Sequence, residues 1–195
     1  VVVIAVAAAP ASATFPGTNG RISFDGVVPG TCCSEIFTAK PSGGDARRLT
    51  STPGRSDSEL PDWSPDGQRI AFDTRVGFDV AQVYVMNADG SGLPQLTSGP
   101  GVHRAAGWSP DAGSLAIAAD WGGGKALQGI WIIPASDPDG VTQEEARRLT
   151  ALPAGFDSDS EPQFSPDGSS IVFTRFKSFS ASAIHRVGID GSGLQ

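Results

Sequence analysis

The chain has 195 residues, of which 25 are glycine and 15 are proline, and its formal net charge at pH 7 is −7. This glycine and proline content is typical of all-β chains with many turns and argues against long helices. The negative charge argues against nucleic acid as a partner, because phosphate backbones attract basic surfaces.

The chain begins with an uncharged apolar segment. Residues 1–10 are followed by Ala11-Ser12-Ala13, a small-x-small pattern that marks signal-peptide cleavage sites. We therefore expect residues 1–13 to be the remnant of a secretory signal peptide, without its basic region and initiator methionine. The alternative is a buried first strand. The segment is shorter than the roughly 20 residues that span a bilayer, so we expect no transmembrane segment. The signal-peptide pattern predicts an exported protein, periplasmic or extracellular, and we expect its source to be bacterial.

One phrase occurs three times in the rest of the chain. Trp-Ser-Pro-Asp-Gly stands at 63–67, and close variants stand at 108–112 and 164–168. The spacing suits repeats of about 40–45 residues with an insertion in the third unit, which is the length of one four-stranded propeller blade. Within the phrase, proline fixes φ at the second turn position and glycine accepts a positive φ. Each phrase therefore predicts a hairpin turn.

Alternating apolar residues predict the strands around these turns. Two apolar side chains that share one face of a strand recur at 22 and 24, 70 and 72, 115 and 117, and 171 and 173. A β-branched or aromatic third strand follows each, at 36–37, 83–86, 130–133 and 184–187, and a short fourth strand follows at 47–50, 94–97 and 147–150. We expect an all-β fold of four-stranded antiparallel blades, about three and a half of them, at roughly 15–57, 58–103, 104–160 and 161–195.

These motifs together resemble a known repeat. The phrase at 63–67, Arg-Ile-Ala-Phe at 69–72, Val-Tyr-Val-Met-Asn-Ala-Asp-Gly at 83–90 and Gln-Leu-Thr at 95–97 are similar to the WD-repeat-like β-propeller repeat of TolB and its relatives. The resemblance extends over roughly residues 15–195. It implies a six-bladed ring, but it does not imply one function, because propellers carry many. Three and a half blades are too few for a closed ring, so the chain is expected to be a fragment of a longer protein; the alternative is a ring that closes by association.

Motifs of catalysis and of cofactor binding are missing from the sequence. There is no Gly-x-Ser-x-Gly nucleophile elbow. The run 122–126 lacks the glycine and the hydroxyl residue of a phosphate loop, and 87–90 has too few carboxylates for an EF-hand. Cys32 and Cys33 are adjacent, so they can bridge only through a strained ring and do not form a Cys-x-x-Cys metal motif. We therefore expect no catalytic residue, no metal and no cofactor.

Ligands of a propeller meet the loops around one mouth of its channel, and we expect the partner-binding residues there. The candidates in connections between blades are His103, Arg104, Asp157, Asp159 and Glu161. The candidates in connections inside blades are Arg75, Asp79, Asp120, Trp121, Arg175, Phe176 and Lys177.

Three of these candidates, and the second histidine of the chain, allow more specific expectations. Trp121 and Phe176 are expected to be exposed aromatic anchors for a protein or a sugar. His103 is either a site residue or a solvated loop histidine, whereas His185 fills a slot of Phe37, Tyr84 and Trp131 and is expected to pack. The acidic residues either gather around a cation or keep the loops soluble.

Three functions fit these observations. The first is a non-catalytic exported propeller that binds a protein or a cell-envelope polymer, as the TolB resemblance implies for periplasmic relatives. The second is the propeller of a prolyl-oligopeptidase-type serine peptidase, whose catalytic domain would follow Gln195. The third is a propeller polysaccharide lyase with a metal and histidines in its channel. The missing nucleophile and the two histidines of the chain favour the first.

Overall fold

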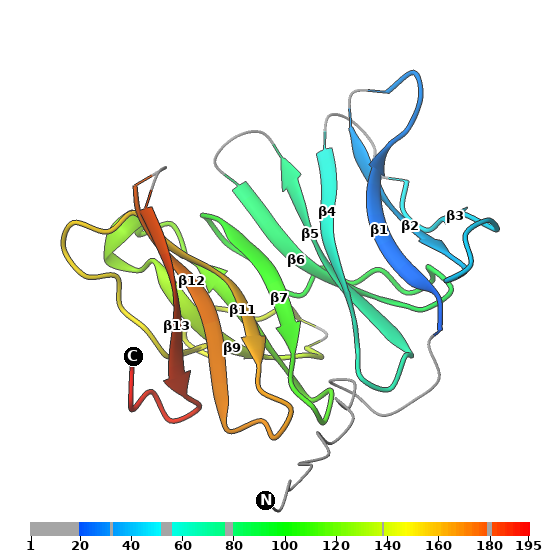
Figure 1. Ribbon diagram of the computed structural model, residues 1–195. Coiled ribbons are helices and arrows are strands. Elements are labelled where there is room, and N and C mark those ends of the chain that lie inside the picture. Colours follow the sequence, from blue (N-terminus) through cyan, green and yellow to red (C-terminus); the bar gives the residue numbers. More distant parts are fainter. Residues whose placement is uncertain (1–19, 32, 52–55, 77–79, 138, 179–180) are drawn as a thin grey trace, which may run out of the picture.

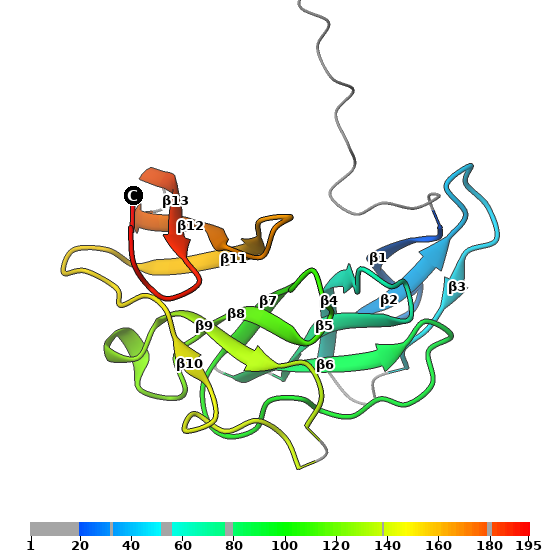
Figure 2. The same cartoon turned by 90° about the horizontal axis from the view of Figure 1, so that it is seen from below.

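The computed structural model describes residues 20–31, 33–51, 56–76, 80–137, 139–178 and 181–195. Its regular secondary structure is all β-strand apart from one short 3-10 helix at Gly124–Ala126 (Figure 1). Four small antiparallel sheets stand side by side in chain order, as Figures 1 and 2 show from two directions. The prediction of an all-β propeller built from antiparallel blades is confirmed. The predicted signal peptide and Cys32 lie outside the described residues, and Cys33 is a buried thiol.

The strands of each sheet follow one another along the chain. The first sheet contains β1 (Ile22–Val27), β2 (Ser34–Ala39) and β3 (Arg47–Arg48). The second contains β4 (Ser56–Trp63), β5 (Arg69–Val76) and β6 (Val80–Asn87). The third contains β7 (His103–Trp108), β8 (Ser114–Ala119), β9 (Gly129–Pro134) and β10 (Arg147–Arg148). The fourth contains β11 (Ser158–Phe164), β12 (Ser170–Ser178) and β13 (Ala181–Gly188).

The predicted fourth strands are short in the structure. β3 and β10 are two residues long, and in the second sheet a single bridge joins Tyr84 to Gln95. Pro94 precedes that bridge and has no N–H to extend the ladder. In the fourth sheet Gln195 exchanges two backbone hydrogen bonds with Arg186, at the place where a fourth strand would pair.

The three phrases occupy equivalent places. Each aromatic residue ends the first strand of its sheet and pairs with the first apolar residue of the second strand. The pairs are Trp63 with Ile70, Trp108 with Leu115, and Phe164 with Ile171. The turn that follows has the predicted chemistry, since Ser64 Oγ donates to Asp66 Oδ1 and Gly67 has a φ of 68°. The predicted equivalence of these positions is confirmed.

A β-bulge interrupts each of these first strands. The register shifts lie between Glu59 and Asp62, between Arg104 and Gly107, and between Ser160 and Gln163. Leu60 and Glu161 lie in two of these bulges, each with a φ of 54°. Left-handed backbone at a residue other than glycine costs on the order of 1 kcal/mol and is frequent at functional sites. Bulges of this kind also re-aim the side chains beside them.

Each interface between neighbouring sheets has its own apolar core. Between the first and second sheets it contains Ile36, Ile70, Phe72 and Met86. Between the second and third it includes Val83, Leu96, Trp108, Leu115, Ile117, Trp121 and Trp131. Between the third and fourth it includes Ala116, Ile130, Phe164, Ile171, Phe173 and Val187. Burial of one such aliphatic or aromatic side chain contributes about 1.5–3 kcal/mol, so these interfaces hold the sheets together.

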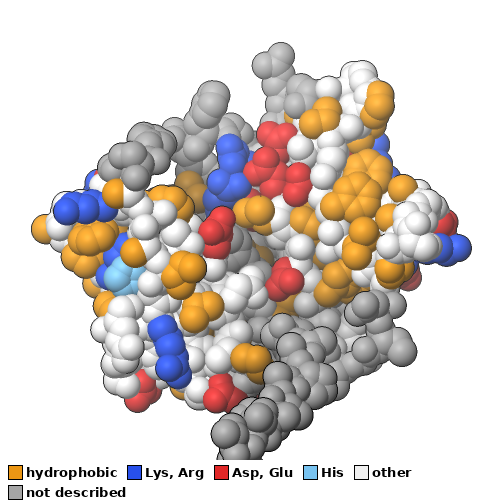
Figure 3. All heavy atoms as spheres, in the orientation of Figure 1, with side chains coloured by type: hydrophobic (Ala, Val, Ile, Leu, Met, Phe, Trp, Pro, Cys, Tyr) orange, Lys and Arg blue, Asp and Glu red, His pale blue; other side chains and the backbone are white. Residues whose placement is uncertain are grey.

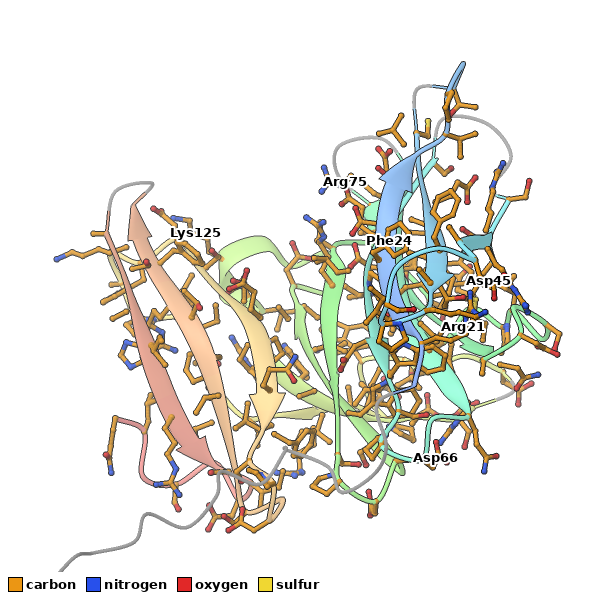
Figure 4. All side chains as sticks on the ribbon, turned by 45° about the vertical axis from the view of Figure 1, so that its right-hand side comes forward. Arg21, Phe24, Asp45, Asp66, Arg75 and Lys125 are labelled. Atoms are coloured by element: carbon orange, nitrogen blue, oxygen red, sulfur yellow. The ribbon has the colours of Figure 1, made fainter. Side chains whose placement is uncertain are left out.

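In the part of the chain that the structure describes, the outer faces of the first and last sheets have no neighbouring sheet to cover them, unlike the faces between the sheets. Ile184 is 81% exposed, whereas Val83 and Ile130, at the same register in β6 and β9, are 0% exposed. On β1, Phe24, which is labelled in Figure 4, is 39% exposed. No helix in the described ranges has the length and apolarity needed to cross a membrane.

Candidate functional site

A cleft of about 400 Å³ lies between the third and fourth sheets, where β7 and β11 begin and β8 ends. We call it the mouth cleft. Its lining residues are Leu60, Val102, Arg104, Ala118, Ala119, Asp120, Gln128, Ser158, Asp159, Ser160 and Glu161. Figure 3 shows acidic and basic side chains gathered near the centre of this face. The cleft brings together four of the predicted site residues from distant parts of the chain.

Four residues that are predicted from the sequence to lie in connections between blades lie in strands instead, so that part of the prediction is wrong. His103, Arg104, Asp159 and Glu161 lie within the first strands β7 and β11. These strands are polar and lack apolar alternation, so they resemble loops in the sequence. They form because their backbones pair with β8 and β12.

Arg104 joins the third sheet to the second. Its Nε donates to Asp73 Oδ2 over 3.0 Å, and one terminal nitrogen donates to Glu59 Oε2 over 2.8 Å. Arg75, labelled in Figure 4, also donates to Glu59 Oε2, over 3.2 Å, and lies on β5 rather than in a loop. Two carboxylates therefore fix the orientation of the Arg104 guanidinium at the cleft wall.

Asp159 and Arg175 form a buried ion pair rather than free loop charges. Arg175 donates to both carboxylate oxygens of Asp159, over 2.6 and 2.7 Å, and the two side chains are 3% and 0% exposed. Thr150 Oγ1 donates to Asp159 Oδ2 over 2.7 Å. The prediction that these two residues are loop charges is wrong, because both lie in strands and their charges neutralise each other.

His103 is buried, with no exposed surface, and is not a solvated loop residue. Its Nδ1 lies 2.9 Å from Gln82 Oε1, which also accepts a hydrogen bond from Thr97. Burial lowers the pKa of His103 from its ordinary 6.5 to about 4, while the nearby Asp120 carboxylate acts in the opposite direction. His103 is therefore neutral at pH 7.

Trp121 is not the exposed anchor that the sequence predicted. It is 6% exposed, and its ring centroid lies 4.2 Å from that of His103 and 5.9 Å from that of Trp131. The side chain folds back into the apolar core between the second and third sheets, because its indole gains more by burial there than in the loop. The prediction failed because such folding back depends on tertiary contacts.

The remaining predicted residues do not line the mouth cleft or lie outside the described residues. Phe176 and Lys177 belong to β12, where Phe176 is half-buried and Lys177 is exposed. Asp157 is exposed and pairs with Lys125 over 2.8 Å. Asp79 lies outside the described residues.

Two carboxylates of the cleft have no ion-pair partner among the residues that the structure describes. Asp120 Oδ1 accepts hydrogen bonds from the backbone N–H of Val102 and Gly122, over 2.9 and 3.0 Å. Glu161 Oε2 accepts one from Thr174 Oγ1 over 3.2 Å. With Arg104 already held by two acids, the cleft offers carboxylate acceptors beside an apolar floor of alanine, valine and leucine side chains. Within the described ranges, no group of three or more His, Cys, Asp and Glu side chains is placed to hold a metal ion.

Asp73 and Gln128 also belong to this site and are not among the residues predicted from the sequence. Asp73 lies within an apolar strand directly after Phe72, at a register where β8 has Ala118. An aspartate within an otherwise apolar strand is the sequence signal that could have marked this residue, because a buried acid needs a partner. Gln128 Nε2 donates to the Asp159 carbonyl over 2.8 Å, and nothing in the sequence marks that contact.

No family model matches the sequence. Two curated proteins are similar to parts of it. The uncharacterized peptidase YuxL of Bacillus subtilis (strain 168) is 30% identical over 153 residues, which cover 63% of this chain and 22% of YuxL. The Tol-Pal system protein TolB of Anaeromyxobacter dehalogenans (strain 2CP-C) is 48% identical over 46 residues, which cover 24% of this chain and 10% of that TolB. The matched parts thus span only a minor share of either relative.

Solved structures share the fold at low identity. A putative TolB from Agrobacterium tumefaciens matches with a TM-score of 0.68 and 22% identity, over 86% of this chain and 57% of that chain. A prolyl endopeptidase matches with a TM-score of 0.60 and 13% identity, over 83% and 25%. An oligogalacturonate lyase matches with a TM-score of 0.58 and 17% identity, over 83% and 41%. The four sheets, their repeated register and these similarities together show that the chain has the fold of a TolB-like β-propeller.

Proposed function

We propose that the chain is part of an exported, non-catalytic β-propeller that binds a protein or a cell-envelope polymer at the mouth cleft. The observation that carries the proposal is the cleft itself. It combines an apolar floor with two carboxylates that have no ion-pair partner among the described residues, and rigid strands supply its walls. Such a mixture of apolar area and a few fixed polar groups is what ligand sites use.

The histidines support a role without catalysis. The sequence has two, and neither is placed as a general base at the cleft. His103 is buried with Nδ1 bonded to Gln82, and His185 Nδ1 bonds the Gln195 carbonyl on the fourth sheet. A general base must reach the proton that it abstracts within hydrogen-bond distance, directly or through one water.

Export is part of the proposal and is supported by the sequence. The apolar run 1–10 and Ala11-Ser12-Ala13 are typical of a signal peptide, and the TolB resemblance implies a periplasmic protein.

The similarity to YuxL favours a second candidate function. An identity of 30% over 63% of the chain makes these blades comparable to part of a protein named as a peptidase. In that case a catalytic domain would lie outside these residues, and the mouth cleft would select the peptides that reach it. Turnover of a peptide by the complete protein would replace the scaffold proposal by this one.

Site-specific photo-crosslinking tests the scaffold proposal. A photoreactive phenylalanine analogue replaces Glu161 in the complete protein, and a matched control carries it at Asp89, in the exposed turn that follows β6 at the other end of the second sheet. We expect discrete adducts from the native extracytoplasmic fraction at position 161 and not at position 89. Equal adducts at both positions, or none at 161, would contradict the proposed binding face.

A further inference from the structure

The loop after β8 holds an unusual backbone. Trp121 has a φ of 47°, the left-handed region that side chains other than glycine rarely adopt, and Gly122 and Gly124 beside it have φ of 75° and 54°. Local strain of this kind persists only where surrounding contacts enforce it. Here the enforcing contact is the insertion of the Trp121 ring between the second and third sheets, against His103.

The inserted pair leaves two polar atoms unsatisfied. Trp121 Nε1 and His103 Nε2 are buried and have no hydrogen-bond partner among the described residues. The tautomer follows from the network. Gln82 Nε2 donates to the Gly99 carbonyl, so Gln82 Oε1 faces His103 as an acceptor, and Nδ1 of His103 must carry the proton. Nε2 is then a bare lone pair inside an apolar core.

Protonation of Nε2 would place a cation with a new N–H at this position. The charged groups on the neighbouring strands are already engaged, Glu59 on β4 and Asp73 on β5 with Arg104, and Asp159 on β11 with Arg175. β6 contributes the neutral Gln82 side chain, Glu161 of β11 lines the mouth cleft, and β8 faces His103 with Ala119.

Asp120, next to Trp121 in the chain, is the remaining acid near the imidazole, and it raises the pKa of His103 against the effect of burial. Its Oδ1 holds the backbone N–H groups of Val102 and Gly122 at the wall of the mouth cleft. A protonated His103 therefore competes with these backbone groups for Asp120.

We propose that Asp120, Trp121 and Gly122 form a proton-triggered gate at the mouth cleft. Protonation of His103 draws Asp120 away from Val102 and Gly122 and releases the Trp121 ring from between the sheets. The movement relieves the left-handed backbone, exposes the indole N–H to water and reshapes the cleft wall that Val102 and Asp120 line. The two arrangements differ by one proton on His103.

Fluorine NMR of the full chain labelled with 5-fluorotryptophan tests the gate. The four tryptophans give four resonances, which single Trp→Phe variants assign. Between pH 7 and 3 we expect the Trp121 resonance to titrate with a midpoint near the His103 pKa of about 4 and to gain a solvent isotope shift. The Trp63 and Trp108 resonances are expected to stay in place through that midpoint.

Two variants separate the gate from general acid sensitivity. His103→Gln keeps a donor for Gln82 but cannot titrate, so the Trp121 transition is expected to disappear, while the control His185→Gln keeps it. Asp120→Asn keeps an acceptor for Val102 and Gly122 but removes the charge, so the midpoint is expected to move to lower pH.

Three results would overturn the proposal. One is an unchanged Trp121 transition in His103→Gln. Another is a Trp121 ring that stays buried through the titration, held by a cation–π contact with the charged imidazole. The third is movement of all four resonances at one midpoint in the unaltered chain, which means global unfolding. Should His103→Gln fail to fold, the midpoint of Asp120→Asn decides, and an unshifted midpoint contradicts the gate.

Discussion

Replacement of Asp62 by asparagine is expected to stabilise the fold near neutral pH. Asp62 lies on β4 opposite Ala71, and burial raises the pKa of its carboxyl from 3.8 to about 6, against hydrogen bonds from the backbone of Trp108 and Trp63. This rise in pKa corresponds to about 3 kcal/mol of stability, which we reduce to about 2 kcal/mol because the side chain is partly exposed and water screens its charge.

The sign follows from linkage. A carboxyl whose pKa is higher in the folded state binds its proton more tightly there, so its contribution to stability is present below pH 3.8 and is lost as the pH rises through about 6. Asparagine mimics the protonated form at every pH. We therefore expect Asp62→Asn to raise the free energy of unfolding by about 2 kcal/mol at pH 7 and to leave it unchanged near pH 3.5.

Titration of His103 changes the stability in the opposite direction over the same pH range. Because its folded pKa is depressed to about 4, its contribution is present above pH 6.5 and is lost as the pH falls toward 4. The shift corresponds to about 3 kcal/mol for this fully buried ring. In the unaltered chain the two titrations largely offset each other, so stability is expected to vary little between pH 4 and 6.5. In Asp62→Asn only the histidine component remains, and stability should fall with acid.

Urea unfolding followed by circular dichroism at half-unit steps from pH 3.5 to 7.5 measures both effects. Asp25→Asn, an exposed aspartate on β1, serves as the matched control and is expected to follow the unaltered chain. An Asp62→Asn chain that is no more stable than the unaltered one at pH 7 would refute the burial argument. A curve for that variant without a decline below pH 6.5 would refute the His103 contribution.

Further expectations concern the interfaces between the sheets and the uncovered outer faces of the first and last sheets. Arg175→Met is expected to cost about 3–5 kcal/mol in urea unfolding, because it leaves the Asp159 carboxylate buried without a partner, and a second change of Asp159 to Asn should restore most of the loss. Trp121→Ala should lower the free energy of unfolding by about 3–5 kcal/mol rather than weaken binding alone, and unchanged stability would mean that the ring is not packed as described. The 195-residue chain should self-associate through its uncovered apolar faces in sedimentation velocity, with less association in Ile184→Asp than in the control Leu194→Asp, and a monodisperse monomer would contradict this.

The sheets were predictable because their second and third strands carry a period of two. Ile70 and Phe72 share one face of β5, and Leu115 and Ile117 share one face of β8, as alternation requires. The turn phrase fixed the phase of each repeat, since proline and glycine restrict φ at defined positions. Both signals lie within short segments, so they can be recognised without knowing which sheet packs against them.

The candidate site was less predictable because its strands carry no such period. The first strands read Ser-Asp-Ser-Glu at 56–59 and 158–161 and His-Arg-Ala-Ala at 103–106, which local rules assign to loops. Their pairing depends on β5, β8 and β12, and the burial of His103 and Asp159 depends on the neighbouring sheet. Residues whose state is set by another sheet lie beyond a reading of single segments.

A repeated threonine explains how such polar residues are tolerated between the sheets. The threonine that ends each Leu-Thr pair accepts a hydrogen bond from the backbone of the third strand and donates to a buried acceptor. The pairs of threonine and acceptor are Thr50 with Glu35, Thr97 with Gln82, and Thr150 with Asp159. These threonine hydrogen bonds satisfy one buried polar group at each interface between sheets. One equivalent position in the first strands can therefore hold a different polar residue in each sheet, namely Ser58, His103 and Asp159. The interfaces between sheets thus share one backbone arrangement but differ in the polar residue that they bury. This is why His103 lies between the second and third sheets, and the ion pair of Asp159 with Arg175 lies between the third and fourth.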